Sequence, residues 1–387
     1  MKNKFKVILY YLLITFNTFV FAVEKNDANI LKIGVLTPMS GEMKNLGEEL
    51  LYAINLALHD INNKNIKIYP KDSGSNREVL IKSCEEFEKE GIKIIIGLFD
   101  SKYSNEIYKF KNLTFVSLSN IDSSIKENIL MVGINLESQL LAIKKFIKNQ
   151  KKNKTVILFP KNEYSKHVEK NIKLIDFSNS RVFKYDKDPK ILTRQIEKLT
   201  NYKQRKKNLE SRIKKLEKSE EPKDLRELTK LKQRYTLGKI NFDSIVIIDF
   251  GDSLKSVLTS LAYTDVSEKD VLIITGNQWF DSTILEESSI KSFYFPSVNL
   301  KNFKKFNENF NQSYGYKPNE ITILAYDSIG LIYYIWSKKG KIDSVNSFVF
   351  KNEIKGKIGK FKISEDKVLQ KLNIYKLEEG NFIKNNL

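Results

Sequence analysis

The sequence contains few of the residues from which metal sites and nucleophilic relays are built. Its 387 residues include one cysteine, Cys84, and two histidines, His59 and His167. A Cys/His metal cluster and an internal disulfide are therefore excluded, and a histidine-based relay has few ways to form. Both histidines lie in helical patterns, where we expect surface or capping roles. Cys84 recurs at helical spacing with Leu80 and Phe87 and is expected to face the core.

Motifs that mark common enzyme classes are also missing. The sequence has no glycine-rich phosphate-binding loop, no Gly-x-Ser-x-Gly turn and no constellation of metal ligands. We therefore expect a protein that is not an enzyme, with no catalytic residues, no metal and no cofactor.

Arginine is scarce in a chain that is otherwise strongly basic. Sixty-six Lys and Arg stand against 47 Asp and Glu, a formal net charge of +19, yet only seven of the 66 are Arg. Proteins that read nucleic acids use Arg for bidentate contacts, or interleave basic and aromatic side chains. Neither pattern occurs here, so we expect no nucleic-acid partner.

A long apolar run occurs only at the N-terminus. Three lysines within the first six residues precede a mostly apolar stretch over residues 7–21, and Ala22 supplies a small residue at a cleavage point. This pattern predicts a signal peptide over residues 1–22 and export to the periplasm. The stretch is shorter than the ~20 residues of a membrane span, although an uncleaved anchor is the alternative. Because no Cys follows, we expect no lipoprotein anchor, and no transmembrane segment after cleavage.

Short apolar runs alternate with amphipathic stretches along the rest of the chain. Runs such as Ile94–Ile96 and Ile245–Ile248 are continuously apolar, which is typical of parallel strands buried on both faces. Alternating strands and helices predict an α/β protein with doubly wound parallel sheets. The chain is too long for one ordinary domain, so we expect two lobes.

Doubly wound sheets bind ligands beyond the carboxyl ends of their strands. Small polar residues at such positions can hold an anion on free backbone N–H groups at a helix start, but each can equally be a cap or turn residue. Their recurrence after successive strands favours a ligand site between the lobes. The candidate ligand-binding residues are Ser40, Ser101, Ser119, Tyr164, Phe250, Gln278 and Trp279.

Residues 198–235 have a different pattern, in which two leucine stripes are separated by Pro222. Asp224 is placed to cap the second helix. The stripes consist of Leu209, Ile213 and Leu216, then Leu225, Leu228, Leu231 and Tyr235. The segment has fourteen Lys and Arg against six Asp and Glu, a net charge of 14 − 6 = +8. We expect an antiparallel helical hairpin that either docks on a partner or anionic surface, or is a solvated insertion closed by its own leucines.

Two features lie near the C-terminus. Residues 358–363 and 372–377, with a turn over residues 364–366 between them, predict a β-hairpin. Tyr326 and Asp327 lie on a predicted helix, Glu320–Trp336, where we expect packing and capping roles.

The run Ile33–Gly41, followed by Gly47 and Asp72, resembles the opening of the Leu/Ile/Val-binding type of periplasmic binding protein, the type I fold. The likeness continues in order at Tyr164, Ala325-Tyr326-Asp327 and Gly356–Phe361. The resemblance implies two α/β lobes joined by three crossovers, with a ligand in the cleft. We place the crossovers near Glu137, Gly276 and Lys338. Lobe 1 then comprises residues 31–137 and 276–338, and lobe 2 comprises residues 138–275 and 339–387 with the hairpin inserted.

Within that superfamily, the inserted hairpin and the segment Thr236–Ile248 most resemble the penicillin-binding protein activators of alphaproteobacteria. This implies a non-catalytic regulator of peptidoglycan synthesis that contacts a peptidoglycan synthase. The alternative is a solute-binding protein that delivers an amino acid or a related small anionic or amide ligand to an ABC transporter permease.

The resemblance also maps the amino-acid site onto this chain. Ser101 falls where the family binds the ligand carboxylate, and Ser119 falls near the next carboxylate contact. Leu46 stands where amino-acid binders have an aromatic side chain, and Gln278 stands where they have an acidic partner for the ligand ammonium. A buried ammonium without a charged partner costs on the order of several kcal/mol, so ordinary branched-chain amino-acid binding is disfavoured.

Overall fold

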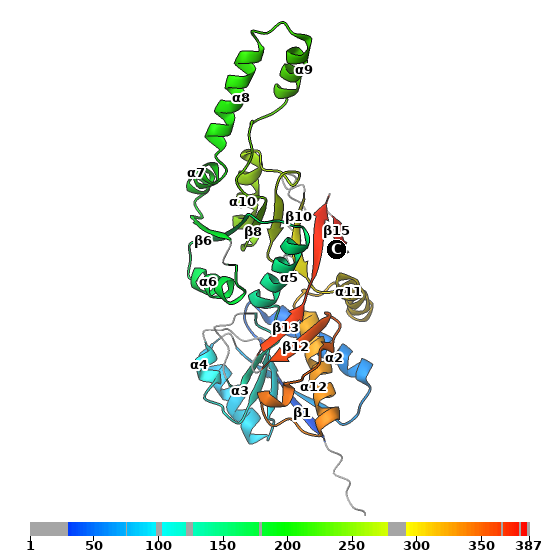
Figure 1. Ribbon diagram of the computed structural model, residues 1–387. Helices are drawn as coiled ribbons and strands as arrows, with labels where there is room; N and C mark the ends of the chain where they lie inside the picture. The colour runs from blue at the N-terminus through cyan, green and yellow to red at the C-terminus, as the bar shows by residue number, and fades with distance from the viewer. Residues whose placement is uncertain are drawn as a thin grey trace, which may run out of the picture.

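The structure is a computed structural model that describes residues 30–74, 76–97, 103–120, 127–177, 180–277, 292–364, 367–378 and 381–384. Figure 1 shows two α/β lobes stacked end to end, with a helical arm projecting from lobe 2 on the side away from lobe 1. The expected signal peptide over residues 1–22 lies outside the described residues. Within the described ranges, no helix combines the length and the apolar character needed to cross a bilayer.

Lobe 1 is built on an eight-stranded sheet in the order β11-β12-β13-β5-β4-β3-β1-β2. Strands β1 to β5 pair in parallel, and β13 joins β5 in parallel, while β11, β12 and β13 pair antiparallel. The strands are β1 (Leu31–Thr37), β2 (Ile66–Asp72), β3 (Ile94–Gly97), β4 (Thr114–Ser117), β5 (Ile129–Met131), β11 (Ile354–Lys355), β12 (Lys360–Ser364) and β13 (Lys367–Lys371).

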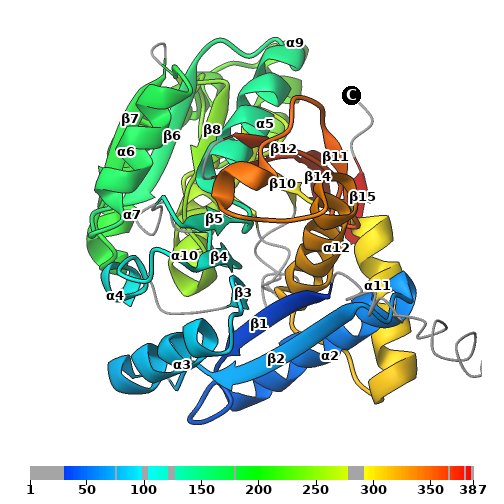
Figure 2. The ribbon, with the colours of Figure 1, turned by 90° about the horizontal axis from the view of Figure 1, so that it is seen from below.

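Helices cover both faces of this sheet, as Figure 2 shows from below. One core lies between the sheet and helices α2, α11 and α12, and the other lies between the sheet and helices α3 and α4. Cys84 is fully buried in the second core, as expected. The helices are α2 (Lys44–Ile61), α3 (Arg77–Lys89), α4 (Ser104–Ile107), α11 (Leu300–Tyr314) and α12 (Thr322–Lys339), with a 3-10 turn η4 (Val345–Phe348).

Lobe 2 is built on a seven-stranded sheet in the order β15-β14-β10-β9-β8-β6-β7. Helices α5 and α6 cover one face, and α7 and α10 cover the other. The strands are β6 (Thr155–Pro160), β7 (Arg181–Tyr185), β8 (Ser244–Ile247), β9 (Leu272–Thr275), β10 (Ser292–Ser297), β14 (Asn373–Glu378) and β15 (Asn381–Lys384). The helices are α5 (Leu136–Asn149), α6 (Ser165–Leu174), α7 (Pro189–Leu199) and α10 (Gly251–Tyr263).

The chain passes between the two sheets three times within the described residues, but two of the expected boundaries are wrong. The first crossing precedes α5, close to Glu137 as expected. The second follows Ser297 rather than Gly276, because β10 pairs with β9 and β14 of lobe 2. The third lies between Lys371 and Asn373 rather than near Lys338, because β11 to β13 extend the sheet of lobe 1.

The expected C-terminal hairpin is formed by different strands. β12 pairs antiparallel with β13 in lobe 1, whereas β14, which covers most of residues 372–377, pairs with β10 in lobe 2. Alternation of apolar residues identifies a strand with one buried face, but it does not identify the sheet to which the strand adds.

Candidate functional site

The four described candidates for the site between the lobes each follow a strand and make contacts within their own lobe. Ser40 follows β1, and its hydroxyl donates to the Asp72 carboxylate at 2.6 Å. The other Asp72 oxygen accepts from the backbone N–H groups of Met39 and Gly74, both at 2.8 Å. Burial tends to raise the pKa of Asp72, but these hydrogen bonds outweigh it and lower the pKa. Ser40 therefore fastens the loop after β1 to the end of β2.

Ser119, Tyr164 and Phe250 follow β4, β6 and β8. The carbonyl oxygen of Ser119 accepts from the N–H of Gly133 at 3.2 Å. The Tyr164 ring lies 4.9 Å from the His167 ring between centroids, and the Phe250 side chain is 60% exposed at the N-cap of α10. The remaining candidates, Ser101, Gln278 and Trp279, lie outside the described residues.

A buried polar pair stands beside Phe250 that the sequence analysis did not single out. The Tyr185 hydroxyl, fully buried at the end of β7, donates to the Asp249 carboxylate. The other oxygen of Asp249 accepts from the Phe250 N–H at 2.9 Å. Burial and the nearby negative charge of Asp249 raise the pKa of Tyr185. The signal in the sequence was an aspartate directly after a continuously apolar strand.

The first and third crossings are joined by buried hydrogen bonds. The Asn135 amide donates to the Val368 carbonyl at 2.8 Å, and the Gln370 N–H donates to the Ser138 hydroxyl at 2.9 Å. Lys367 forms an ion pair with Glu137. A groove of about 700 Å³ opens beside these crossings, between α5 and the β12–β13 strands. These bonds join the start of α5, which packs in lobe 2, to β13 in the sheet of lobe 1.

A second groove, of about 770 Å³, lies on lobe 1 between α2, α11, α12 and the segment after β11. Asp327 lines it and accepts from the N–H groups of Lys357 and Ile358 at 2.8 and 2.9 Å. It therefore holds the segment after β11 against α12 and does not cap a helix, contrary to the expectation. Burial raises the pKa of Asp327 to about 6, against the lowering effect of these hydrogen bonds. Tyr326 donates to Asp60 on α2.

The arm consists of α8 (Tyr202–Leu216) and α9 (Pro222–Leu231), which form the expected hairpin. Leu209, Leu216 and Leu231 are buried between the helices, and the Arg212 guanidinium makes a two-pronged contact with the Glu227 carboxylate at 2.7 and 2.8 Å. Burial of leucines and a bidentate ion pair together hold α9 against α8.

Three details of the arm differ from expectation. Glu221 is the N-cap of α9 and Pro222 is its first residue, so Asp224 lies inside the helix and does not cap it. Leu225 is 48% exposed, because residues spaced by three drift around a 3.6-residue helix and Leu225 leaves the stripe that Leu228 and Leu231 form. Tyr235 lies beyond the end of α9 and is 76% exposed.

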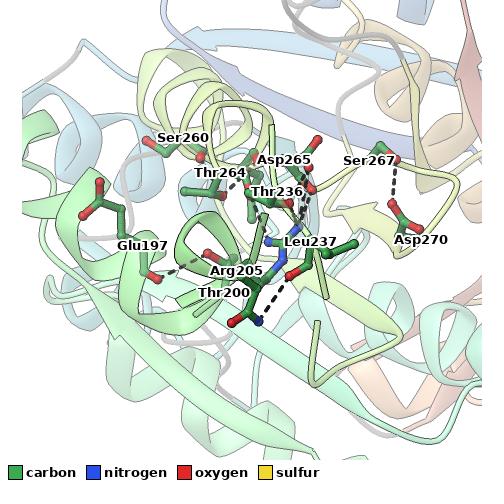
Figure 3. Close-up of polar contacts among 12 residues, drawn as sticks. Glu197, Thr200, Arg205, Thr236, Leu237, Ser260, Thr264, Asp265, Ser267 and Asp270 are labelled. Atoms are coloured by element: carbon green, nitrogen blue, oxygen red, sulfur yellow. Dashed lines mark hydrogen bonds and ion pairs between the residues drawn. The ribbon is translucent and has the colours of Figure 1, made fainter. Parts of the chain in front are cut away.

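The base of the arm is fastened to lobe 2 by Arg205, which is only 5% exposed (Figure 3). Its guanidinium donates to the carbonyl oxygens of Thr264 and Asp265 at 3.0 and 3.1 Å, just after the end of α10. It also donates to the Thr236 hydroxyl at 2.7 Å, and its own carbonyl oxygen accepts from the Leu237 N–H at 3.0 Å. Arg205 thus ties together the first helix of the arm, the segment by which the chain returns from the arm, and the body of lobe 2.

Arg205 has a charged neighbour as well as neutral acceptors. The Asp265 carboxylate lies 3.8 Å from the guanidinium and accepts from the Thr236 hydroxyl at 2.5 Å. Burial lowers the pKa of Arg205, but a guanidinium starts so far above neutrality that it stays charged. The sequence analysis missed this cluster, because Arg205 is one of fourteen basic residues in the segment.

Comparisons with known proteins agree with this architecture. Residues 30–175 match the family model described as periplasmic binding protein. A search of curated proteins finds no match.

Among residues 30–277 and 292–384 that the structure describes with short gaps, no three His, Cys, Asp or Glu side chains gather as a metal-ligand set.

Solved structures of similar fold include transporter proteins and a regulator. The leucine-binding protein LivK of Thermotoga maritima is 14% identical, with 92% of this chain and 98% of that chain covered and a TM-score of 0.58. A putative branched-chain amino acid ABC transporter protein of Rhodospirillum rubrum is 10% identical, with 92% and 100% covered and a TM-score of 0.69. The C-domain of LpoA of Haemophilus influenzae, described as a regulator of PBP1A, is 13% identical, with 92% and 99% covered and a TM-score of 0.59.

The chain has the two-lobed α/β fold of the Leu/Ile/Val-binding type of periplasmic binding protein, and this confirms the expected fold class. This fold occurs both in solute-binding proteins and in a regulator of PBP1A. The chain spans 59% of the length of full-length LpoA.

Proposed function

We propose that the protein is a non-catalytic periplasmic regulator of peptidoglycan synthesis that acts by contact with a synthase. The observation that carries this proposal is the arm, a basic helical hairpin that stands off lobe 2 and is fastened by Arg205 (Figures 1 and 3). A protruding element held in one geometry suits recognition of a large partner, because little conformational freedom is lost when it binds. The C-domain of LpoA, a regulator of PBP1A, supports the proposal by sharing the fold.

The state of Ser40 favours a contact protein over a carrier of small molecules. Its hydroxyl donates its single proton to Asp72, so it has no proton left to donate to a ligand carboxylate. The resemblance also places the neutral Gln278 where amino-acid binders have an acidic partner for the ligand ammonium. Both residues therefore disfavour binding of an amino acid.

The proposal is tested by binding and stimulation assays with the penicillin-binding proteins of the same organism. A shortened-arm variant replaces residues 207–233 with a short Gly-Ser linker and keeps both Arg205 and the returning segment at Thr236. We expect the full chain to bind one synthase and raise its rate of glycan polymerisation. The shortened-arm variant should bind at least tenfold more weakly while its lobes unfold at the same temperature. Equal binding and stimulation by both proteins would refute a role for the arm.

The second candidate function is delivery of a small anionic or amide ligand to an ABC transporter permease. It is supported by the similar folds of LivK and of LivJ from Streptococcus pneumoniae, the latter solved with isoleucine. A thermal-shift screen of amino acids, short peptides and cell-wall fragments tests it. A ligand that stabilises the protein, and whose effect is lost in Ser101→Ala, would favour this function. No shift across all three groups would count against it.

A further inference from the structure

The charged side chains of the arm divide into a paired set and an unpaired set. The pairs bridge the two helices and their ends: Arg212 with Glu227, and Lys232 with Glu217 at 3.2 Å. The remaining cations point to solvent, and within the described part of the chain they have no ion-pair partner. They are Lys206, Lys207, Lys214, Lys215, Lys218, Lys223, Arg226, Lys230 and Arg234. The internal pairs stabilise the hairpin, and the excess of positive charge lies on its surface.

One face of the arm combines this charge with an exposed apolar side chain. Leu225, Arg226, Thr229 and Lys230 lie on the side of α9 opposite Leu231, which packs against α8. Leu225 is 48% exposed. We call these four residues the outer face of α9. Protein interfaces are typically arranged in this way, with an apolar anchor surrounded by polar and charged side chains that fix the partner's orientation.

A lipid bilayer is a poor match for the arm. A helix that lies in a membrane surface needs a broad apolar face to insert. The apolar faces of both arm helices are already used against each other, at Leu209, Leu216 and Leu231. On the outer face of α9 only Leu225 is a large apolar residue. Attraction to anionic lipid would then rest on charge alone and would not depend on Leu225.

We propose that the outer face of α9 docks on an acidic surface of a protein partner, with Leu225 entering an apolar recess and Arg226 and Lys230 meeting carboxylates. The inference rests on the proposed function in taking the arm as the contact element, but it does not require the partner to be a synthase. The partner is defined by its chemistry, since only an acidic surface complements this excess of positive charge. Arg205 at the base and the Arg212–Glu227 pair hold the face in position before the partner arrives.

Site-specific photocrosslinking in cells tests the inference on the full chain. p-Benzoylphenylalanine is placed at Thr229, which is exposed on the outer face of α9, and in a control at Leu174, which is exposed on α6 in lobe 2. We expect a discrete protein adduct at Thr229 that is absent at Leu174. Mass spectrometry should map its crosslinks to a patch of net negative charge on the partner.

Two matched charge reversals decide whether the face or only the charge matters. Arg226→Glu with Lys230→Glu alters the outer face of α9, and Lys207→Glu with Lys214→Glu makes the same charge change on the outward side of α8. We expect the first pair to reduce the adduct at least tenfold, and the second pair to reduce it less than threefold. Leu225→Ser should also reduce the adduct at least fivefold. All five positions are exposed, so circular dichroism and thermal unfolding should match those of the unsubstituted protein.

The outcomes separate the inference from the proposed function. An adduct with a peptidoglycan synthase that shows these losses supports both. An adduct with a different acidic protein and the same losses supports the docking face and refutes the synthase as partner. Equal loss from the two charge reversals, no effect of Leu225→Ser, or binding of the arm only to phosphatidylglycerol vesicles or to purified peptidoglycan would overturn the inference.

Discussion

The guanidinium of Arg205 donates a hydrogen bond to the carbonyl oxygen of Thr264 at 3.0 Å, across 59 residues of sequence. The first residue lies in the first turn of the arm, and the second directly follows α10 in the body of lobe 2. The carbonyl groups at a helix end have no partner within the helix, and a guanidinium carries enough donors to satisfy two of them and a hydroxyl together. The direction of the arm is therefore set by one buried side chain.

Replacing this side chain should loosen the arm. Arg205→Lys keeps the positive charge but cannot reach Thr264, Asp265 and Thr236 together, so we expect a loss of roughly 2–3 kcal/mol in the free energy of unfolding. Cleavage by trypsin at the base of the arm should also become faster. Lys206→Ala, at the exposed neighbouring position, should stay within about 0.5 kcal/mol. Urea unfolding and limited proteolysis provide the measurements, and equal behaviour of the two variants would contradict the role of Arg205.

Asp327 should make stability depend on pH in the weakly acidic range. Burial raises its pKa from 3.8 to about 6 in the folded protein. The folded pKa lies above the unfolded one, so the protonated carboxyl group is favoured by folding. Its contribution to the free energy of unfolding is fully present below pH 3.8 and is lost as the pH rises through 6. The total loss is at most about 3 kcal/mol. We therefore expect the unfolding free energy of the protein, relative to that of Asp327→Asn, to fall between pH 4 and pH 7. Parallel stability curves for the two proteins would show that this group does not titrate with a raised pKa.

Gly47 should tolerate no side chain. A Cβ added there would lie 1.8 Å from the carbonyl oxygen of Pro38, in the loop that follows β1. Gly47→Ala must push α2 away from this loop, at a cost of roughly 3 kcal/mol. Gly330 in α12 is the matched control, because a Cβ added there meets nothing within 4 Å, and Gly330→Ala should gain about 1 kcal/mol from helix propensity. Thermal unfolding distinguishes the two, and a stable Gly47→Ala would refute the close approach.

Tyr185 should matter through its hydroxyl group. Tyr185→Phe leaves the buried Asp249 carboxylate without this donor, so we expect a loss of roughly 1–3 kcal/mol in the free energy of unfolding. Tyr235→Phe removes the same atom from a side chain that is 76% exposed and should change nothing measurable. Chemical denaturation of the two variants gives the comparison. A neutral Tyr185→Phe would mean that water or another donor replaces the hydroxyl.

Local sequence patterns predicted the elements well where one physical requirement dominated. Ile94–Ile96 is apolar throughout, and β3 is indeed buried along its whole length. The hairpin was predictable because Pro222 begins a helix easily but cannot continue one, and it stands between two leucine stripes. Leu225 was misplaced, because a spacing of three residues is compatible with a helix but does not say which residues face the partner helix.

The candidate site was harder to predict than the fold. A serine after a strand is equally suited to bind an anion or to hold a turn, and Asp72, 32 residues away from Ser40, decides between the two. Tyr185 and Asp249 are 64 residues apart, and their pairing depends on the parallel order of β7, β6 and β8. No local pattern encodes such a relationship.

The amino-acid sequence by itself determined the α/β class, the two lobes and the basic helical insertion, because these follow from apolar periodicity, chain length and local charge. Only the tertiary structure decided which lobe receives β10 and β14, that Ser40 is engaged by Asp72, and that Arg205 fastens the arm to lobe 2. Those outcomes depend on hydrogen bonds and packing between residues far apart in the chain. Such contacts form only where the folded backbone brings their atoms within about 3 Å of each other.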